Sequence, residues 1–267
     1  MDNITQLLDQ VSIQPIESNQ VDLIDSATSL SDLVDLLNNE LPTQPPSIYI
    51  DIEGENLSRD GSISILQLYM LPTQRTYLID IFVLGKASFT VRGRKGRTLR
   101  GVLEDATIPK VFFDVRNDSD ALYSHFGISL AGIQDLQLME LASRGFNRRF
   151  VNGLARCIER DGRMTMTEKL RWKQCKEKGV RLFAPERGGS YAVFNRRPLD
   201  REIKDYCAQD VQFLPRLWEH YNRKMTPRWR QRVLETSRTR VVESQSDSYA
   251  PHGKQKALAP KGWDSIN

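Results

Sequence analysis

The sequence predicts an α/β domain: a five-stranded sheet, its first three strands antiparallel, flanked by helices. Three short runs rich in β-branched and aromatic residues follow one another with only turn residues between them, which indicates a meander. Two later strands alternate with helical patterns, and from about residue 140 the periodicity is helical. The predicted strands are 46–53, 63–70, 76–82, 110–115 and 134–138.

The region before the first strand, residues 1–44, is predicted to be an acidic tail with one short helix. Residues 1–20 are polar and aperiodic, whereas apolar residues recur at helical spacing between 29 and 37, behind serines that can cap a helix. Pro42, Pro45 and Pro46 end this helix and lead into the first strand.

The first strand, 46–53, ends in two carboxylates. Its isoleucines point to one face, and Asp51 and Glu53 share the other because side chains alternate along a strand. An ionised side chain on a covered strand is costly unless a cation meets it, so this is a natural place for a divalent metal. The alternative is a strand that runs out into solvent, since Asp-x-Glu is a common tripeptide.

Two further carboxylates occupy core-facing helical positions. Asp118 shares a face with Ala121 and Leu122 in a predicted helix over 117–126, where a helix N-cap is the alternative role. Tyr206 and Asp210, four residues apart, lie one above the other on the inner stripe of a predicted helix over 199–223. A Tyr–Asp hydrogen bond within the core is the alternative there.

Four inward carboxylates that met in a medium of low dielectric would repel one another unless cations neutralised them. Oxygen ligands in this number select Mg²⁺ or Mn²⁺ over zinc, which prefers His or Cys. Two such ions can activate a water and stabilise the leaving oxygen during phosphodiester cleavage. This set of residues therefore fits metal-assisted hydrolysis.

The order Asp51-x-Glu53, Asp118, Tyr206-x-x-x-Asp210 resembles the DEDD superfamily of 3′-to-5′ exonucleases, in the subgroup with Tyr in its last motif. The resemblance covers roughly 46–222. It is reinforced by 110–122 and by Arg197-Pro198-Leu199, which are similar to ribonuclease D-like proteins of a eukaryotic, fungal-looking branch.

This resemblance implies a ribonuclease H-like fold with a mixed five-stranded sheet. It also implies a hydrolase that removes nucleotides from the 3′ end of RNA or single-stranded DNA, with two Mg²⁺ or Mn²⁺ ions per site. Asp51, Glu53 and Asp210 would bind the metal that carries the attacking water, with Asp51 bridging to a second metal that Asp118 supports. Tyr206 would orient the water.

The resemblance leaves Asp114, four residues before Asp118, outside the metal shell. The exonuclease domain is predicted over 45–242. Residues 243–267, in which Ser, Gln, Pro, Gly and Lys dominate, are predicted to be a disordered tail.

The charges are unevenly distributed. The first 60 residues hold twelve acidic side chains and a single basic one, Arg59, so the other 207 residues carry 37 basic and 22 acidic side chains. This excess favours a polyanionic partner, with solvated basic faces as the alternative. Further basic stretches lie at 144–149, 181–187 and 223–232. The predicted nucleic-acid-binding residues are Arg92, Arg94, Lys95, Arg97, Arg228 and Arg230.

Cys157, Cys175 and Cys207 lack CxxC spacing, which argues against a disulfide framework or a zinc site. No long apolar run and no signal peptide are evident, so we expect an intracellular protein of cytoplasm or nucleus that does not enter membranes. Two other functions stay open at this point. One is a catalytically weak or silent RNA-binding adaptor, and the other is an interaction module that docks through the acidic N-terminal region.

Overall fold

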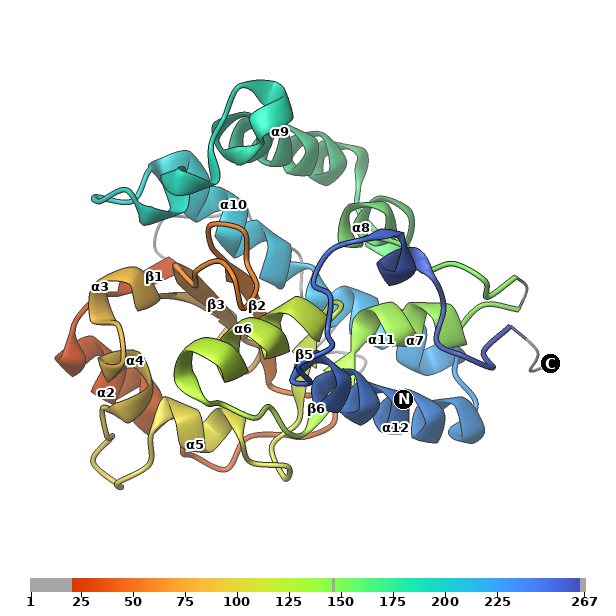
Figure 1. The fold of residues 1–267 in the computed structure, drawn as a ribbon, viewed down its shortest axis with the longest axis horizontal. Coiled ribbons are helices and arrows are strands. Elements are labelled where there is room, and N and C mark those ends of the chain that lie inside the picture. Colours follow the sequence, from red (N-terminus) through yellow and green to blue (C-terminus); the bar gives the residue numbers. More distant parts are fainter. Residues whose placement is uncertain (1–20, 146, 265–267) are drawn as a thin grey trace.

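A computed structural model describes residues 21–145 and 147–264; the predicted tail over 1–20 and the last three residues lie outside this part. A six-stranded sheet in the order β1-β4-β3-β2-β5-β6 forms its centre (Figure 1). The strands are β1 (Val21–Ile24), β2 (Ile48–Glu53), β3 (Ile65–Met70), β4 (Arg75–Asp80), β5 (Lys110–Phe112) and β6 (Ile133–Asp135). β2, β3 and β4 are antiparallel, and the other neighbours are parallel. The predicted mixed α/β fold is confirmed.

Helices cover both faces of this sheet. They are α2 (Ala27–Leu37), α3 (Ile81–Leu84), α4 (Ala87–Thr90), α5 (Leu99–Leu103), α6 (Arg116–Phe126), α7 (Leu136–Ala142), α8 (Leu154–Asp161), α9 (Met166–Phe183), α10 (Arg201–Gln212), α11 (Leu214–Lys224) and α12 (Pro227–Ser244), with short 3₁₀ turns η2 (Pro185–Arg187), η3 (Tyr191–Asn195) and η4 (Lys254–Ala257). No helix in the described parts of the chain is long and apolar enough to cross a membrane.

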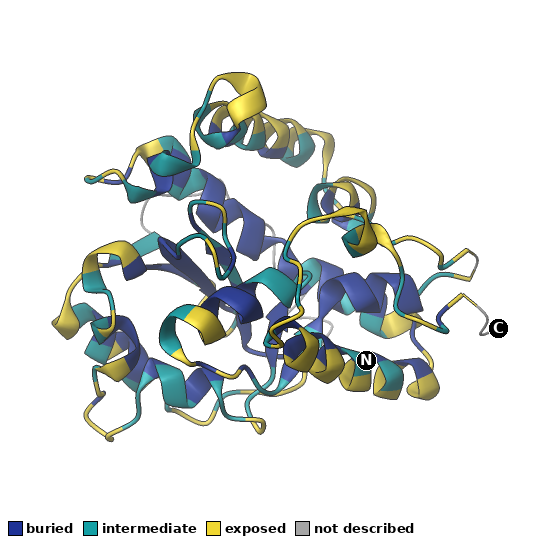
Figure 2. Ribbon diagram, in the orientation of Figure 1, coloured by how far each residue is buried: buried dark blue, intermediate teal, exposed yellow. Residues whose placement is uncertain are grey.

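The alternation along β2 divides the core into two sides. Its three isoleucines pack with α2, α5 and α6, whereas Tyr49 packs with α7 and α11 on the other face. β2 lies between β3 and β5, so both of its faces are covered, as the dark blue sheet in Figure 2 shows. Asp51 and Glu53 therefore lie on the same face as Tyr49, where α10 packs on Ile65 of β3 and Leu78 of β4.

The sheet has one strand more than predicted. β1 pairs in parallel with β4, with Val21 opposite Thr76, and Arg75 binds the carboxylate of Asp22 at 2.7 Å. A strand of four residues, Val-Asp-Leu-Ile, is too short to show a clear alternation of apolar and polar side chains. Its partner β4 lies about fifty residues later in the sequence. This part of the predicted N-terminal tail therefore belongs to the sheet.

Other differences arise where a polar or proline residue ends an element. The predicted helix over 199–223 is divided into α10 and α11, because Pro215 opens a new helix and has no N–H to continue the old one. The third strand ends at Asp80, whose carboxylate accepts the Val83 N–H at 3.0 Å and starts α3. Asp135 ends β6 in the same way, accepting from Gln137 N at 3.0 Å.

The segment that follows α12, residues 245–264, lies against the body, although the sequence predicts a disordered tail there. Trp263 is only 1% exposed, and its ring centroid lies 5.0 Å from that of Trp229. This anchor is a single aromatic residue in a polar stretch, so it gives no periodic signal in the sequence. We call residues 245–264 the α12 extension.

Candidate active site

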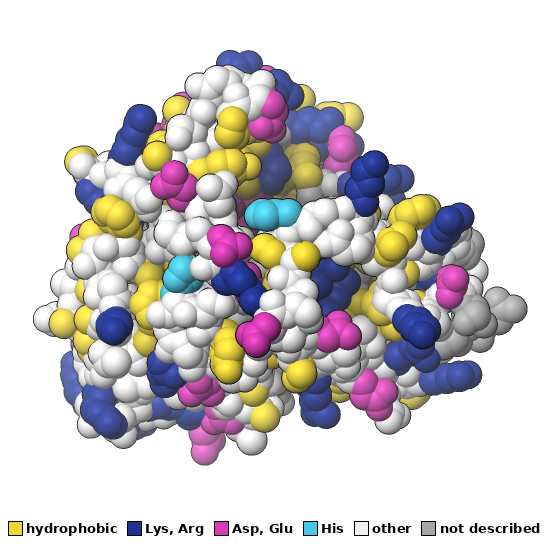
Figure 3. Space-filling view, in the orientation of Figure 1, with side chains coloured by type: hydrophobic (Ala, Val, Ile, Leu, Met, Phe, Trp, Pro, Cys, Tyr) yellow, Lys and Arg dark blue, Asp and Glu magenta, His cyan; other side chains and the backbone are white. Residues whose placement is uncertain are grey.

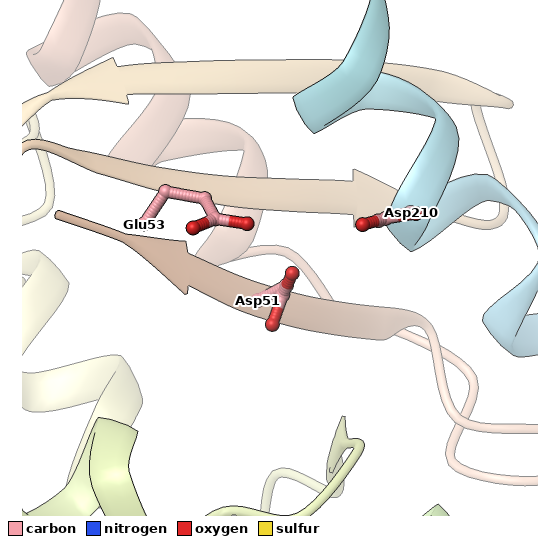
Figure 4. Close-up of side chains that lie close together, drawn as sticks. All are labelled: Asp51, Glu53 and Asp210. Carbon is pink, nitrogen blue, oxygen red and sulfur yellow. The ribbon is translucent and has the colours of Figure 1, made fainter. Parts of the chain in front are cut away.

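Three of the predicted carboxylates meet on the α10 side of the sheet. Asp51 and Glu53 project from β2, and Asp210 comes from α10 to meet them (Figure 4). Each of the three offers an oxygen that lies within 4.8 Å of the oxygens of the other two. Asp210 is 2% exposed, whereas Asp51 and Glu53 are partly exposed. The result is a compact, mostly buried group of acidic oxygens.

The α10 residues reach this place because the helix is fixed at its start and along its inner face. Asp200 caps it by accepting from Glu202 N at 2.7 Å, and Ile203 and Cys207 bury the same face against the sheet. Tyr206 and Asp210 follow one turn apart on that face. The spacing that the sequence shows thus delivers both side chains to β2.

Burial and mutual repulsion raise the pKa values of the two β2 carboxylates, Asp51 and Glu53. Burial, and then the charge of Asp210, raise the pKa of Asp51 from 3.8 to about 7. Burial and the charge of Asp51 raise the pKa of Glu53 well above its usual value. The three carboxylates are therefore under electrostatic strain that a bound cation would relieve.

A lysine from α9 supplies positive charge to the cluster. Lys176 Nζ lies 3.2 Å from both carboxylate oxygens of Asp210 and 4.9 Å from the ring centre of Tyr206. Burial alone would lower the pKa of Lys176, but Asp210, Glu53 and Asp51 together raise it. A single ammonium faces three carboxylates, so it neutralises only part of their charge.

α9 also packs closely against Tyr206. A Cβ at Gly179 would lie 2.7 Å from the Cβ and ring of Tyr206, a distance that real Cβ atoms do not show. Phe183, one turn further along α9, packs on the same ring at 5.0 Å. Burial, and then Asp210, raise the pKa of Tyr206 well above its usual value, which keeps its hydroxyl protonated.

The fourth carboxylate, Asp118, lies beside the other three rather than among them. It is 5% exposed in the first turn of α6. Burial, then the charge of Asp51, raise the pKa of Asp118 well above its usual value, which indicates that the two carboxylates are near each other. Asp135 fixes the start of α6, since its carboxylate accepts from Asp114 N at 3.0 Å and Val115 N at 3.3 Å.

A family model of a 3′-5′ exonuclease matches residues 21–226. This chain belongs to that family. The match includes all five residues of the predicted constellation, and it extends from β1 through α11.

Solved structures of RNase D have the same exonuclease fold. The RNase D of Trypanosoma brucei bound to GMP has a TM-score of 0.72 and 21% identity, over 92% of this chain and 70% of the other. The same enzyme in complex with RNA U12 has a TM-score of 0.72 at 19% identity, with 92% and 78% covered. Escherichia coli RNase D has a TM-score of 0.54 and 17% identity, over 85% of this chain and 51% of the other.

Curated relatives of this chain share a shorter stretch with it. The piRNA biogenesis protein EXD1 of Mus musculus is 37% identical over 89 residues, which are 33% of this chain and 14% of that protein. EXD1 of Xenopus laevis is 34% identical over 116 residues, 42% of this chain and 24% of that protein. The chain thus matches less than a quarter of the length of these relatives.

The carboxylate cluster of this chain suits the divalent metals that its family normally uses. The donors of the trio are all carboxylate oxygens, and they converge from two elements. The raised pKa values of Asp51 and Glu53 indicate a shortage of positive charge there. Asp114 has its own partner, because its carboxylate binds Arg116 at 2.5 and 2.7 Å. That pairing agrees with its place outside the predicted metal shell.

The structure does not gather the predicted nucleic-acid-binding residues at this site. Arg94 lies 3.4 Å from Asp32 and from Asp35 of α2, and Arg97 pairs with Asp105. Helix α2 covers the sheet face opposite to Asp51. In the same loop, Arg92 donates to Gly96 O at 2.7 Å, and Lys95 Nζ lies 3.5 Å from Asn39 Oδ1. On α12, Arg228 is exposed and Arg230 donates to Asn222.

Lys and Arg side chains are spread over the whole face in Figure 3, with acidic side chains between them. Charge alone therefore does not single out one binding surface. The assignment of the loop at 92–97 and of α12 to nucleic-acid binding stays a prediction.

Sequence reasoning missed Lys176 and Gly179. Both lie on one stripe of α9 with buried Trp172, at spacings of four and three residues. A lysine and a glycine that continue a buried helical stripe indicate a polar contact and a close approach, respectively, and this signal could have identified them.

Proposed function

We propose that this protein is a divalent-metal-dependent 3′-to-5′ exonuclease that hydrolyses phosphodiester bonds at the 3′ end of RNA or single-stranded DNA. The observation that carries the proposal is the convergence of Asp51, Glu53 and Asp210 within 4.8 Å, with Tyr206 one turn from Asp210. Membership of the 3′-5′ exonuclease family supports it.

In this proposal Asp51, Glu53 and Asp210 would hold one Mg²⁺ or Mn²⁺, and Asp51 with Asp118 a second. The bound ions would neutralise the carboxylates and supply an activated water. Tyr206 keeps its proton at neutral pH, so its hydroxyl is suited to holding the attacking water by a hydrogen bond rather than to removing a proton as phenolate. Lys176, 3.2 Å from Asp210, restrains that carboxylate.

RNA is the first substrate to test. A structure of similar fold contains RNA and another contains GMP. At 19% and 21% identity, this similarity shows a shared fold and not a shared substrate. The alternative function is an RNA-binding adaptor with a weak or silent site. The ion pair between Lys176 and Asp210 favours that alternative, because it ties up a carboxylate that the metal would need.

The direct test is digestion of a single-stranded RNA labelled at its 5′ end. We expect products that shorten one nucleotide at a time from a free 3′ hydroxyl when Mn²⁺ is present, and no products in EDTA. A 3′ phosphate should slow the reaction, and a circular strand should resist it because it offers no end.

Asp210→Asn should abolish this activity, and Asp205→Asn is its matched control. Both residues lie on α10, but Asp205 is part-exposed and its nearest cation is Arg201, at 3.9 Å. Cleavage of the circular strand would show an endonuclease instead. Tight RNA binding without metal-dependent products would show that the protein is an RNA-binding adaptor instead.

A further inference from the structure

The α12 extension lies along the side of the active site that Asp118 occupies. Arg59 Nη2 donates to the carbonyl oxygens of Ser244 and Ser246 at 2.9 and 2.8 Å, which ties the start of the extension to the loop after β2. Further on, Val151 N donates to Ala257 O and Ala259 N to Arg149 O, both at 3.0 Å. In Figure 1 this dark blue segment rises from α12 and passes between α6 and α8.

One side chain of the extension, Lys256, reaches the residue next to Asp118. Its ammonium donates to Asn117 Oδ1 and lies 3.4 Å from the Tyr249 hydroxyl, which itself donates to Asn117 Oδ1 at 2.8 Å. The Lys256 backbone is held as well, since Arg116 Nη2 donates to its carbonyl oxygen at 2.9 Å. The first two residues of α6, which directly precede Asp118, thus fix the position of this lysine.

The charge of Lys256 has no direct counterion. Both partners of its ammonium are neutral, and the lysine forms no ion pair with a carboxylate in the described residues. The residue is half-buried, so part of its hydration is lost without a charged partner in return. An ammonium has three donors, and at most two are used here. A third donor is therefore available to an anion.

The neighbouring groups restrict which anion this can be. Asn117, which accepts the hydrogen bond from Lys256, directly precedes Asp118 in α6, so the ammonium lies beside the active site. The mobile anion expected at a nuclease site is a backbone phosphate of the substrate strand. Phosphate oxygens are recognised by such lysines without regard to sequence.

We propose that Lys256 forms a phosphate subsite: its ammonium binds a non-bridging phosphate oxygen of the nucleic-acid strand where the strand passes Asp118. This inference rests on the proposed exonuclease function and adds to it a substrate contact from outside the residues 21–226 that match the family model. The α12 extension then forms a wall of the substrate groove, with Asn117 and Tyr249 holding the lysine in place.

The test compares Lys256→Met with Lys254→Met, which removes an exposed lysine from the same 3₁₀ turn. Binding of a labelled single-stranded RNA is measured in EDTA over a range of salt concentrations, so that no cleavage occurs. We expect Lys256→Met to raise Kd about tenfold and to lower the slope of log Kd against log salt by about 0.7, the value for one phosphate contact. Lys254→Met should change neither quantity.

Single-turnover cleavage in Mn²⁺ gives a second readout. Lys256→Met should raise the RNA concentration needed for half-maximal rate while the rate at saturation stays within a few fold, and Lys256→Arg should restore binding. A merely structural lysine would lower the melting temperature without changing the salt slope. An unchanged slope for Lys256→Met, or equal losses in both variants, would overturn the subsite.

Failure of this inference is distinguishable from failure of the proposed function. If the parent protein cleaves RNA but Lys256→Met binds it with unaltered salt dependence, the subsite is wrong and the exonuclease stands. If the parent never cleaves RNA but Lys256→Met loses a phosphate contact, the subsite is correct. The RNA-binding adaptor is then favoured over the exonuclease.

Discussion

At the scale of single residues, the site combines groups that the sequence reveals with groups that only the fold reveals. Asp51 and Glu53 share a face by the period of a strand, and Tyr206 and Asp210 by the period of a helix. Lys176 reaches Asp210 across 34 residues of sequence, and no local pattern encodes which carboxylate it meets. The sequence therefore predicts the acidic set but not its countercharge.

Tyr206 gives the sharpest prediction at this scale. If its hydroxyl holds the attacking water, Tyr206→Phe should lower kcat roughly 10²-fold and leave RNA affinity unchanged, because the ring still packs on Phe183. The control is Tyr191→Phe, since Tyr191 stacks on the same phenylalanine at 5.7 Å. Steady-state kinetics and equilibrium binding of both variants check it. Lost affinity with normal kcat would make Tyr206 a substrate-stacking residue.

At the scale of elements, the central strands and the amphipathic helices are predictable because each carries its own periodic signal. β1 is missed because four residues cannot show an alternation, and it is stabilised by pairing with the distant β4. The division between α10 and α11 could have been predicted from Pro215. The α12 extension could not, because its packing depends on isolated residues such as Trp263 and not on a pattern.

The contact between α9 and α10 makes a prediction about Gly179. An alanine in a helix is ordinarily more stable than glycine by about 1 kcal/mol, but here its Cβ would overlap Tyr206. We expect Gly179→Ala to move Tyr206 and lower kcat roughly 10²-fold, the loss typical of a displacement of about 1 Å. Activity measurements and thermal melts check it.

Gly101→Ala in α5 is the matched control, because the nearest atoms to its Cβ would lie at 3.6 Å, an ordinary contact. This variant should be as active as the parent and slightly more stable. A fully active Gly179→Ala would show that the close packing of α9 on Tyr206 does not position the hydroxyl.

At the scale of the whole molecule, metal binding, stability and pH are linked through the carboxylate cluster. Burial and Asp210 raise the pKa of Asp51 from 3.8 to about 7 in the metal-free protein. The folded state then binds this proton more tightly than the unfolded state, so its contribution to stability is full below the unfolded pKa and is lost as pH rises through about 7.

We therefore expect the melting temperature of the metal-free protein to fall from about pH 5 to about pH 8. Asp51→Asn, which carries no titrating group at this position, should show a shallower fall, and the difference between the two melting curves isolates Asp51. Added Mn²⁺ should stabilise the parent more at the higher pH, since the metal needs the ionised carboxylate. A melting temperature that rises over this pH range equally in both proteins would contradict the raised pKa.

The measurement that tests the metal site most directly is a thermal melt of the parent and of Asp51→Asn, each with EDTA and with Mn²⁺. Removing one charge from a repelling cluster should leave the metal-free variant at least as stable as the parent. Mn²⁺ should raise the melting temperature of the parent and do much less for the variant, because a ligand stabilises the state that binds it. A variant destabilised in EDTA by about 1 to 3 kcal/mol, together with a parent that does not respond to Mn²⁺, would mean that Asp51 only supports the fold and that the metal site is wrong.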